Sequence, residues 1–331
     1  MFEKTARSMK KIVTIILLSF IATIAGAQQA AQYSMYIWNK HAFNPAYAGL
    51  DNSLSITGVY RNQWVSLPGN PVSRNVTAHM PLYILGGAIG IALENETLGS
   101  WSQSTVHLSY AWQRVVGHSG ILSVGASAGF LQRQFDGTLA RTPEGIFDDQ
   151  NNYLGHNEQS LPFSIEAGQV PTFSAGAFYQ GEHLEVGISA TNLLENEISL
   201  SSISFVPERS YYFFLGYKTD MGRKLQLNPS VLVKSDIFQT QMDLSLLLRY
   251  NENIYAGASF RGYDTNSRDA IALMGGFRVN DKLTIGYSHD LTLSTLSHVS
   301  NGTHELLLNY NLGKPIGQGK PPIIIYNPRS L

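Results

Sequence analysis

The sequence contains no cysteine, few charged residues and, after its first 27 residues, no long apolar run. The charged residue types make up 14% of the 331 residues, against about 25% in an average soluble domain. Without cysteine the chain is not a small secreted domain held together by disulfides. Without a long apolar run, no helix of the mature chain is expected to cross a bilayer. These absences suit a protein of the bacterial periplasm or outer membrane.

The first 27 residues have the pattern of a secretory signal peptide. Lys10 and Lys11 precede the apolar run 12–25, and Ala25-Gly26-Ala27 is a small-residue cleavage site. We therefore expect residues 1–27 to be removed, because the run is short for the alternative, a membrane anchor. These residues carry four basic groups and one acidic group, so cleavage lowers the net charge from −1 to about −4. This balance gives no reason to expect a nucleic-acid partner.

The mature chain is rich in glycine and shows a two-residue periodicity. Glycine accounts for 30 of the 331 residues, above the usual ~7%. Every second residue from Leu184 to Ala190 is apolar, and the residues between them are polar or glycine; 240–250 and 282–294 alternate in a similar way. A wall between lipid and water requires this alternation, so the pattern predicts a transmembrane β-barrel.

Turn residues between the alternating segments predict an antiparallel barrel of about 14 strands within 53–312. An even number is typical of closed bacterial barrels, whose periplasmic turns are short and whose extracellular loops are longer. The two longest connections, 136–171 and 194–209, fall on the same side, opposite the N-terminus. We therefore expect an outer-membrane barrel with these long loops outside. The expected strands are 53–62, 72–80, 85–94, 101–115, 120–135, 172–180, 183–193, 210–219, 223–235, 240–250, 253–262, 268–279, 282–294 and 303–312.

Several charged residues lie on the inward phase of these strands. They form either a network of paired charges inside the lumen or a selectivity lining for a permeant solute, and the second reading requires them to cluster at a constriction. The inward charges are Glu185, Asp243, Arg249, Arg261, Arg278, Asp290 and Glu305.

Four sequence elements resemble the PorP/SprF family of outer-membrane proteins of the type IX secretion system. They are QYSMYIWNKHAFNPAYAG (32–49), Arg61-Asn62-Gln63-Trp64, IGYSHD (285–290) and GTHELLLNYNL (302–312). The resemblance covers nearly all of the mature chain in order and spacing. The residues that carry it are Phe43, Asn44, Pro45, Ala46, Tyr47, Ala48, Gly49, Arg61, Gln63, Trp64, Gly286, Tyr287, Asp290, Gly302, His304 and Glu305.

The resemblance implies a non-enzymatic component that helps secreted cargo cross or remain at the outer membrane of Bacteroidota-type bacteria, including adhesins in gliding species. It implies three kinds of partner: outer-membrane lipid, a cargo protein with a type IX sorting domain, and other secretion-system subunits. The sequence departs from the family in the interrupted spacing of 32–39 and in a tail, 313–331, which we expect in the periplasm.

The aromatic segment 28–52 lies between the signal peptide and the first expected strand. Proline at 45 forces Asn44 into an extended or turn conformation, and Ala48-Gly49 allows a sharp reversal. The segment can therefore fold back into the lumen as a plug. The alternative is an amphipathic collar at the periplasmic lipid interface, where Trp and Tyr are favoured.

The longest expected loop, 136–171, is the candidate surface for a secreted partner. It offers Phe147, Tyr153 and Leu154 among polar residues, and long loops on a rigid scaffold commonly carry binding residues. The alternative is that the loop folds inward and closes the mouth of the barrel.

Catalytic and metal-binding motifs are not recognisable. His304-Glu305 lacks the second histidine of a zinc-protease motif, and the Asp/Asn-rich stretch 148–155 does not match an EF-hand loop. We expect no cofactor, no metal and no enzymatic activity. A FadL-like or passive channel for small or apolar solutes is the main alternative, and an outer-membrane lipid hydrolase is a distant third.

Cleavage after Ala27 is the first testable prediction. The Ala-Gly-Ala site predicts that mature protein from outer membranes begins at Gln28. Mass analysis of the N-terminal peptide checks this, and finding an intact start at Met1 or Met9 would refute it.

Overall fold

The computed structural model describes residues 31–117, 119–143, 145–150, 153–236, 238–263 and 268–314. The predicted signal peptide and most of the predicted tail lie outside these ranges. The chain divides into two compact units after Ala31, and all that follows concerns the second, Gln32–Leu331. Among the described residues, no helix is long and apolar enough to cross a bilayer.

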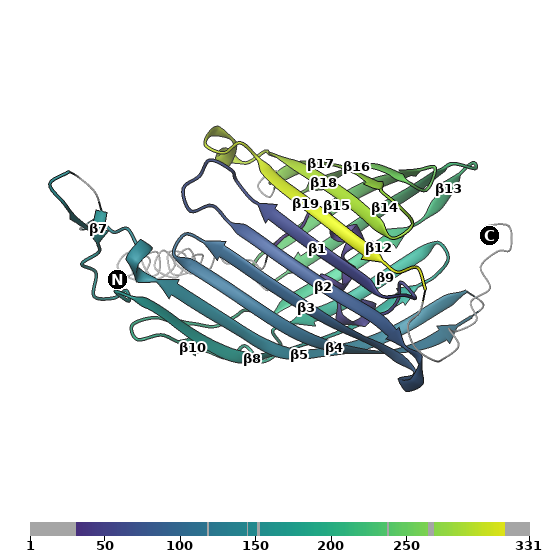
Figure 1. Cartoon of the computed structure of the whole chain (residues 1–331), viewed down its shortest axis with the longest axis horizontal. Helices are drawn as coiled ribbons and strands as arrows, with labels where there is room; N and C mark the ends of the chain where they lie inside the picture. Colours follow the sequence, from purple (N-terminus) through teal and green to yellow (C-terminus); the bar gives the residue numbers. More distant parts are fainter. Residues whose placement is uncertain are drawn as a thin grey trace, which may run out of the picture. The chain divides into compact units, whose positions relative to one another are not determined.

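Fourteen antiparallel strands form a closed ring (Figure 1). Strands adjacent in sequence pair with each other, and β1 pairs with β19 to close the ring. A short strand, β13 (Thr219–Met221), also pairs with β14. The fourteen strands are β1 (Ser55–Asn62), β2 (Val72–Leu82), β3 (Gly87–Leu98), β4 (Trp101–Val116), β5 (Gly120–Asp136), β8 (Ile165–Gln180), β9 (Leu184–Thr191), β12 (Ser210–Tyr217), β14 (Leu225–Ser235), β15 (Thr240–Tyr250), β16 (Ile254–Arg261), β17 (Ala270–Arg278), β18 (Leu283–Thr292) and β19 (Thr303–Asn311).

The predicted barrel and its strand number are confirmed, with one large difference in a boundary. Strand β8 begins at Ile165, seven residues before the expected start at 172. The expected connection ended at Pro171, but this residue lies within β8, where it is paired with Phe130 of β5. Proline is tolerated there because its missing N–H would face away from β5, on a side where no ladder forms.

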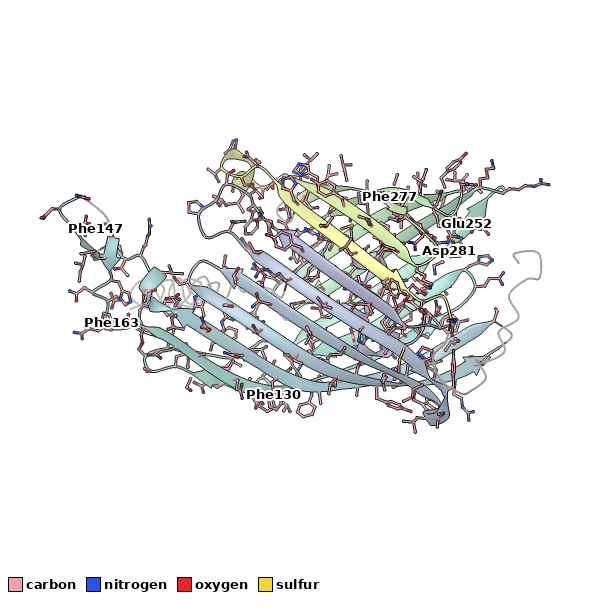
Figure 2. All side chains as sticks on the ribbon, viewed as in Figure 1. Phe130, Phe147, Phe163, Glu252, Phe277 and Asp281 are labelled. Atoms are coloured by element: carbon pink, nitrogen blue, oxygen red, sulfur yellow. The ribbon has the colours of Figure 1, made fainter. Side chains whose placement is uncertain are left out.

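Side chains alternate between lipid-facing and inward positions along every strand. In β15, Leu244 and Leu246 are exposed on the outer face, whereas Asp243 and Ser245 are buried inside. Figure 2 shows Phe130 and Phe277, two exposed aromatic side chains of the wall. Exposed aromatic residues lie toward both ends of the strands, as expected at membrane interfaces; they include Tyr60, Tyr211, Tyr110, Trp112, Tyr217, Tyr250 and Tyr310.

The connections differ between the two ends of the barrel. Those after β2, β4, β8, β12, β15 and β17 have three to seven residues, and we call this the short-turn end. The other, long-loop end carries the two longest connections, 137–164 and 192–209. Short turns face the periplasm in outer-membrane barrels, so the long-loop end faces outward.

One side of the barrel extends further than the rest toward the long-loop end. Strands β4, β5 and β8 have 16, 17 and 16 residues, whereas β1, β9, β12 and β16 have eight each. We call β4, β5 and β8 the tall wall. Near its long-loop end the outward side chains become polar, as at Ser102, Ser104 and Gln132. This part of the wall therefore lies above the apolar belt.

A pair of arginine substitutions on the outer face tests this placement. Leu246→Arg puts a charge into the apolar belt and is expected to destabilise the barrel by about 2 to 4 kcal/mol. Gln132→Arg also points outward but lies above the belt, so it should leave stability almost unchanged. The free energy of unfolding in lipid vesicles measures both. Similar losses in the two variants would contradict the assigned depth.

Candidate functional site

The lumen contains residues 32–50, which we call the inner segment. It forms three short 3-10 turns, η1 (Tyr36–Trp38), η2 (Lys40–Ala42) and η3 (Pro45–Tyr47), and appears in purple inside the ring of strands (Figure 1). Its first residues lie near the long-loop end, where Gln32 accepts a hydrogen bond from Gln241. It ends at the short-turn end, just before β1. Most of its side chains are buried, so it occupies much of the space inside the barrel.

Asn44 and Pro45 fix the last turn, η3, of the inner segment. The Asn44 side chain accepts a hydrogen bond from the Ala46 N–H at 2.9 Å and caps η3, with proline at its first position. The same side chain donates to the carbonyls of Ala177 and Ile188, both at 3.1 Å. One asparagine thus shapes the segment and attaches it to β8 and β9.

Glu305 holds the beginning of the inner segment. Its carboxylate accepts hydrogen bonds from the backbone N–H groups of Ser34 and Met35, at 2.9 and 2.8 Å. It also forms an ion pair with Arg61 at 2.8 Å. These groups are all buried. One carboxylate on β19 therefore binds the inner segment and a strand neighbour together.

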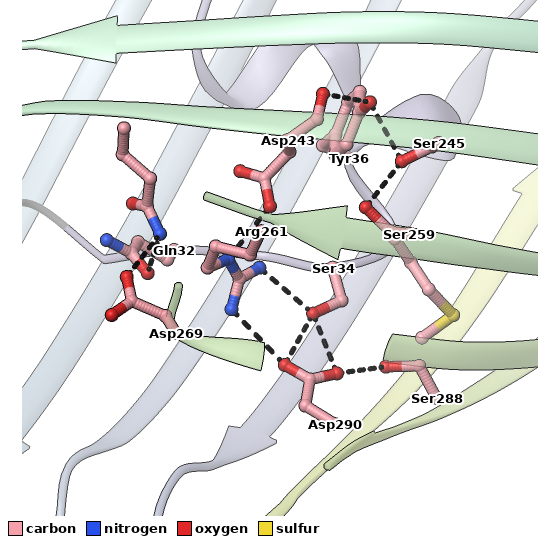
Figure 3. A network of polar contacts seen from close by, with 12 residues as sticks. Gln32, Ser34, Tyr36, Asp243, Ser245, Ser259, Arg261, Asp269, Ser288 and Asp290 are labelled. Atoms are coloured by element: carbon pink, nitrogen blue, oxygen red, sulfur yellow. Dashed lines mark hydrogen bonds and ion pairs between the residues drawn. The ribbon is translucent and has the colours of Figure 1, made fainter. Parts of the chain in front are cut away.

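Ser34 links this carboxylate to a larger polar cluster, of which Figure 3 shows Asp243, Arg261 and Asp290. Its hydroxyl donates to Asp290 at 2.7 Å and accepts from Arg61 and Arg261 at 3.0 and 3.1 Å. Arg261 also pairs with Asp243 at 2.8 Å. We call the set the anchor cluster; its members are Ser34, Arg61, Asp243, Arg261, Asp290 and Glu305.

The anchor cluster contains two guanidinium groups and three carboxylates, all nearly inaccessible to solvent. Buried charges are costly unless each is paired and hydrogen-bonded. Here each carboxylate has an arginine partner, and the surplus negative charge is shared among donors of the inner segment. The cluster therefore needs the inner segment in place.

Lys40 attaches the segment to the opposite side of the barrel. Its ammonium group lies 2.7 Å from Glu185, which also binds Lys218 at 2.7 Å. The ammonium stands 5.1 Å from the centre of the Tyr47 ring and 5.4 Å from that of Phe214. Burial lowers the pKa of Lys40 more than the nearby carboxylate raises it.

An apolar cluster supports the polar attachments. Tyr36, Phe43, Ala46, Tyr47 and Leu50 of the inner segment pack against wall residues Ile121, Phe178, Phe214 and Leu232. Glycine in the wall permits the close approach: a Cβ added to Gly125 would lie 2.6 Å from the Ala46 Cα. The segment is therefore fitted to this wall by shape as well as by charge.

His41 is a buried, neutral member of the segment. Its ring lies 5.2 Å from that of His79, and its Nε2 is 3.3 Å from the Ser109 hydroxyl. Burial lowers the pKa of His41 to about 3, with a further contribution from His79. Among the described residues, no three His, Asp or Glu side chains are arranged to hold a metal ion.

Most of the family-motif residues meet in or around the inner segment. Residues 43–49 belong to it, Arg61, Asp290 and Glu305 join the anchor cluster, and an added Cβ at Gly286 would lie 3.0 Å from the Met35 sulfur. Scattered positions in the sequence are thus brought together in the lumen.

Other motif residues lie elsewhere. Gln63 and Trp64 occupy the connection between β1 and β2. Tyr287 and His304 face outward, hydrogen-bonded to each other at 2.6 Å. Gly302 has φ +84° next to the Asp290 carbonyl, where a side chain would not fit. These residues shape turns and the outer face.

The seven predicted inward charges divide into two sets. Glu185, Asp243, Arg261, Asp290 and Glu305 are buried, and all of them bond to the inner segment or to a neighbour that does. Arg249 and Arg278 lie on inward phases near the short-turn end, where Arg278 donates to the Tyr255 hydroxyl at 3.4 Å. Among the described residues, the five buried charges therefore hold the inner segment in the lumen.

Several residues of the site were not predicted from the sequence. Ser34 and Lys40 belong to a segment without periodicity, so no pattern marked them. Glu94, on the inward phase of an expected strand, was a detectable candidate; it accepts hydrogen bonds from Tyr33 and Asn75 at 3.2 and 3.1 Å.

The candidate partner loop contains a small hairpin, β6 (Ile146–Phe147) and β7 (Tyr153–Gly155). Phe147, labelled in Figure 2, is 49% exposed and Leu154 is 66% exposed. The side chain of Tyr153 is outside the described part of the structure. Two of the three candidate residues therefore present apolar surface to solvent.

Comparisons with known proteins give a family and several solved structures that resemble this chain. A family model for the type IX secretion system membrane protein PorP/SprF matches residues 25–310. No curated protein matches the chain. The toluene transporter TbuX of Ralstonia pickettii has a TM-score of 0.48 and 11% identity, over 83% of this chain and 92% of its own. The monoaromatic hydrocarbon channel CymD has a TM-score of 0.46 and 12% identity, over 89% and 96%. Omp33 of Acinetobacter baumannii has a TM-score of 0.47 and 7% identity, over 79% and 98%.

Removing the Glu305 carboxylate tests the anchor cluster. Glu305→Ala leaves two buried backbone N–H groups without their acceptor and Arg61 with Asp290 alone, so we expect a loss of about 2 to 5 kcal/mol in the free energy of unfolding. The same substitution at Glu182, exposed in a turn, is the control and should change stability little. Equal effects in chemical denaturation of the two variants would contradict the assigned role.

Proposed function

Because the chain belongs to the PorP/SprF family and is thus an outer-membrane component of the type IX secretion system, we propose that it assists the secretion or surface retention of particular cargo proteins. In this proposal the inner segment plugs the lumen, and the barrel is a rigid scaffold for the loops at the long-loop end. The cargo is a secreted protein with a type IX sorting domain, such as a gliding adhesin. Other subunits of the secretion system are its further partners.

The occupied lumen is the observation that carries this proposal. The inner segment is bonded to β19 through Glu305 and to β9 through Glu185. It also bonds to β2, where Asn39 donates to Asn75 at 2.9 Å. Attachments around the ring hold the segment across the interior. A solute would have to break the buried Lys40–Glu185 ion pair or the hydrogen bonds to Glu305 to pass, which disfavours conduction as the primary task.

The long-loop end supports the assignment of the binding surface. Its connection between β5 and β8 presents Ile146, Phe147, Leu154 and Phe163, all exposed. Exposed aromatic and aliphatic side chains on loops are suited to anchoring a protein partner. Secreted cargo that has crossed the membrane meets this end of the barrel first.

The channel reading requires the inner segment to move. A FadL-like or passive channel would release the anchor cluster and open the lumen, leaving Arg61, Asp290 and Glu305 to be solvated by water. The family is one of secretion proteins rather than enzymes, and lipid hydrolysis has no further support among the described contacts.

Shortening the candidate loop tests the proposal. Replacing residues 144–158 with a Gly-Ser linker should leave the barrel assembled, because no barrel ladder uses them, but should release cargo into the medium. The matched control replaces Thr295–His298, a 3-10 turn at the same end. Surface labelling of cargo and its recovery from the medium are the readouts.

Two outcomes would count against the proposal. If the shortened barrel inserts normally and retains its cargo as the control does, the loop is not the binding surface. If cargo stays but small apolar solutes now enter the cell, the loop is a lid and the channel reading replaces the proposed one.

A further inference from the structure

Strand β8 forms a long ladder with one neighbouring strand and a short ladder with the other. On one side β5 pairs with it along its whole length, from Asp136 opposite Ile165 to Ile121 opposite Gln180. On the other side β9 pairs only from Ala175 to Gln180. The part of β8 from Ile165 to Ser174 therefore has no ladder on the β9 side. This is the segment of β8 that belongs to the upper part of the tall wall.

The hydrogen bonds around β8 show which backbone groups face the open side. The Ser164 carbonyl accepts from the Gly137 N–H at 3.2 Å, so even-numbered residues face β5. The Phe173 carbonyl accepts from the Leu193 N–H at 3.0 Å, so odd-numbered residues face the other side. Backbone groups alternate in direction along a strand. The N–H and C=O groups of Ile165, Ala167 and Gln169 therefore point to the open side.

These six groups form no hydrogen bond with another described residue of the chain. All three residues are exposed, and Ile165 is 58% exposed. We call Ile165–Gln169 the open edge. Unpaired strand edges are templates for another strand, and proteins commonly cover or break them.

The nearby connection leaves the open edge uncovered. Residues 192–209 carry β10 (Ile198–Ser199) and β11 (Ser204–Phe205), which pair with each other. An added Cβ on Gly168 would lie 2.5 Å from the Ile198 side chain, so Ile198 covers the inner face of β8. Ser201 donates its N–H to the Glu166 side chain at 2.8 Å, again on an inward residue. At residues 198–201 the connection therefore lies against the face of the strand. Closer to β9 it does reach the edge, where Asn196 donates to the Pro171 carbonyl at 3.2 Å, but no such bond is made by a described residue to Ile165, Ala167 or Gln169.

The open edge lies in water rather than in lipid. It lies beside the part of β4 and β5 where outward residues are polar, as at Ser104 and Gln132, and its own outward residues include Gln169. It also directly follows the connection with exposed Phe147 and Leu154. Backbone hydrogen-bonding groups are therefore available at the end that faces out of the cell, beside an apolar surface.

We propose that the open edge binds an extended strand of the retained secreted protein, which adds to β8 in antiparallel direction. This mode of recognition uses main-chain hydrogen bonds for affinity and alternate side chains for specificity. The incoming strand would place its outward side chains beside Ile165 and Gln169. The inference deepens the proposed function, because it names the contact by which cargo is held.

A second copy of the chain does not fit the open edge. Two identical edges pair antiparallel around a two-fold axis, so their β8 strands run in opposite directions. Two barrels in one membrane have the same orientation, and their β8 strands run the same way. Symmetric antiparallel pairing would place one barrel upside down. The partner must therefore supply a strand of its own.

Proline at residue 167 tests the proposal. Ala167→Pro removes an N–H that faces the open side and spares the ladder with β5, as expected for proline on a strand edge. We expect a normally assembled barrel that retains roughly tenfold less secreted protein, since a hydrogen bond and the close approach of a strand are both lost. Ala167→Ser keeps the N–H and is the matched control, with retention unchanged.

Amide hydrogen exchange provides a second measurement that does not depend on a variant. In the barrel purified alone, the amides of Ile165, Ala167 and Gln169 should exchange rapidly, and those of Glu166 and Gly168 slowly. In the complex purified with its secreted protein from native membranes, all five should be protected. Unchanged exchange at the three odd positions would overturn the proposal.

The outcomes separate this inference from the proposed function. If the unmodified barrel retains no secreted protein, the proposed function fails. If the unmodified protein and Ala167→Pro retain it equally, only strand addition is overturned. If protection of the edge appears together with a barrel dimer and no second protein, the edge is an interface between copies and the proposal is wrong.

Discussion

The structure depends on one interaction, in which a buried carboxylate accepts hydrogen bonds from backbone amides inside the barrel. Glu305 accepts from two N–H groups of the inner segment while it pairs with Arg61. A ring of fourteen strands encloses more space than its own side chains fill, and the inner segment supplies the missing atoms and donors. The wall in turn supplies acceptors for a segment that has no ladder of its own. Neither part is satisfied without the other.

The strands were predictable because the membrane imposes a simple rule on them. Lipid outside and polar groups inside make every second residue apolar, and this holds along β9 and β15 as the sequence indicated. The alternation of apolar and polar residues is not required above the apolar belt, where both faces of a strand meet water. Upper β8, with Glu166, Gly168 and Gln169, lies above the apolar belt and has no reason to alternate, so its start at Ile165 was not visible, and the expected connection ran on to Pro171.

The site was predictable in part, and the reason lies in the kind of residue involved. Asp290 and Glu305 are charges on strands that phase and motif both marked, whereas Arg61 was marked by the motif alone. Their common partner, Ser34, sits in a segment of short turns and lies 271 positions from Glu305 in sequence. No local pattern encodes such a pairing, because it exists only after the ring has closed.

The position of the inner segment in the chain sets an order of assembly. It precedes β1, while its anchors come from β1, β15, β16, β18 and β19, the first strand and several of the last. The segment must be inside before β1 and β19 join, since a closed wall would obstruct its entry. Seam closure and completion of the anchor cluster are therefore one event. A barrel that closed without its segment would enclose Glu305 without the two backbone N–H donors that share its charge, and would be less stable from within.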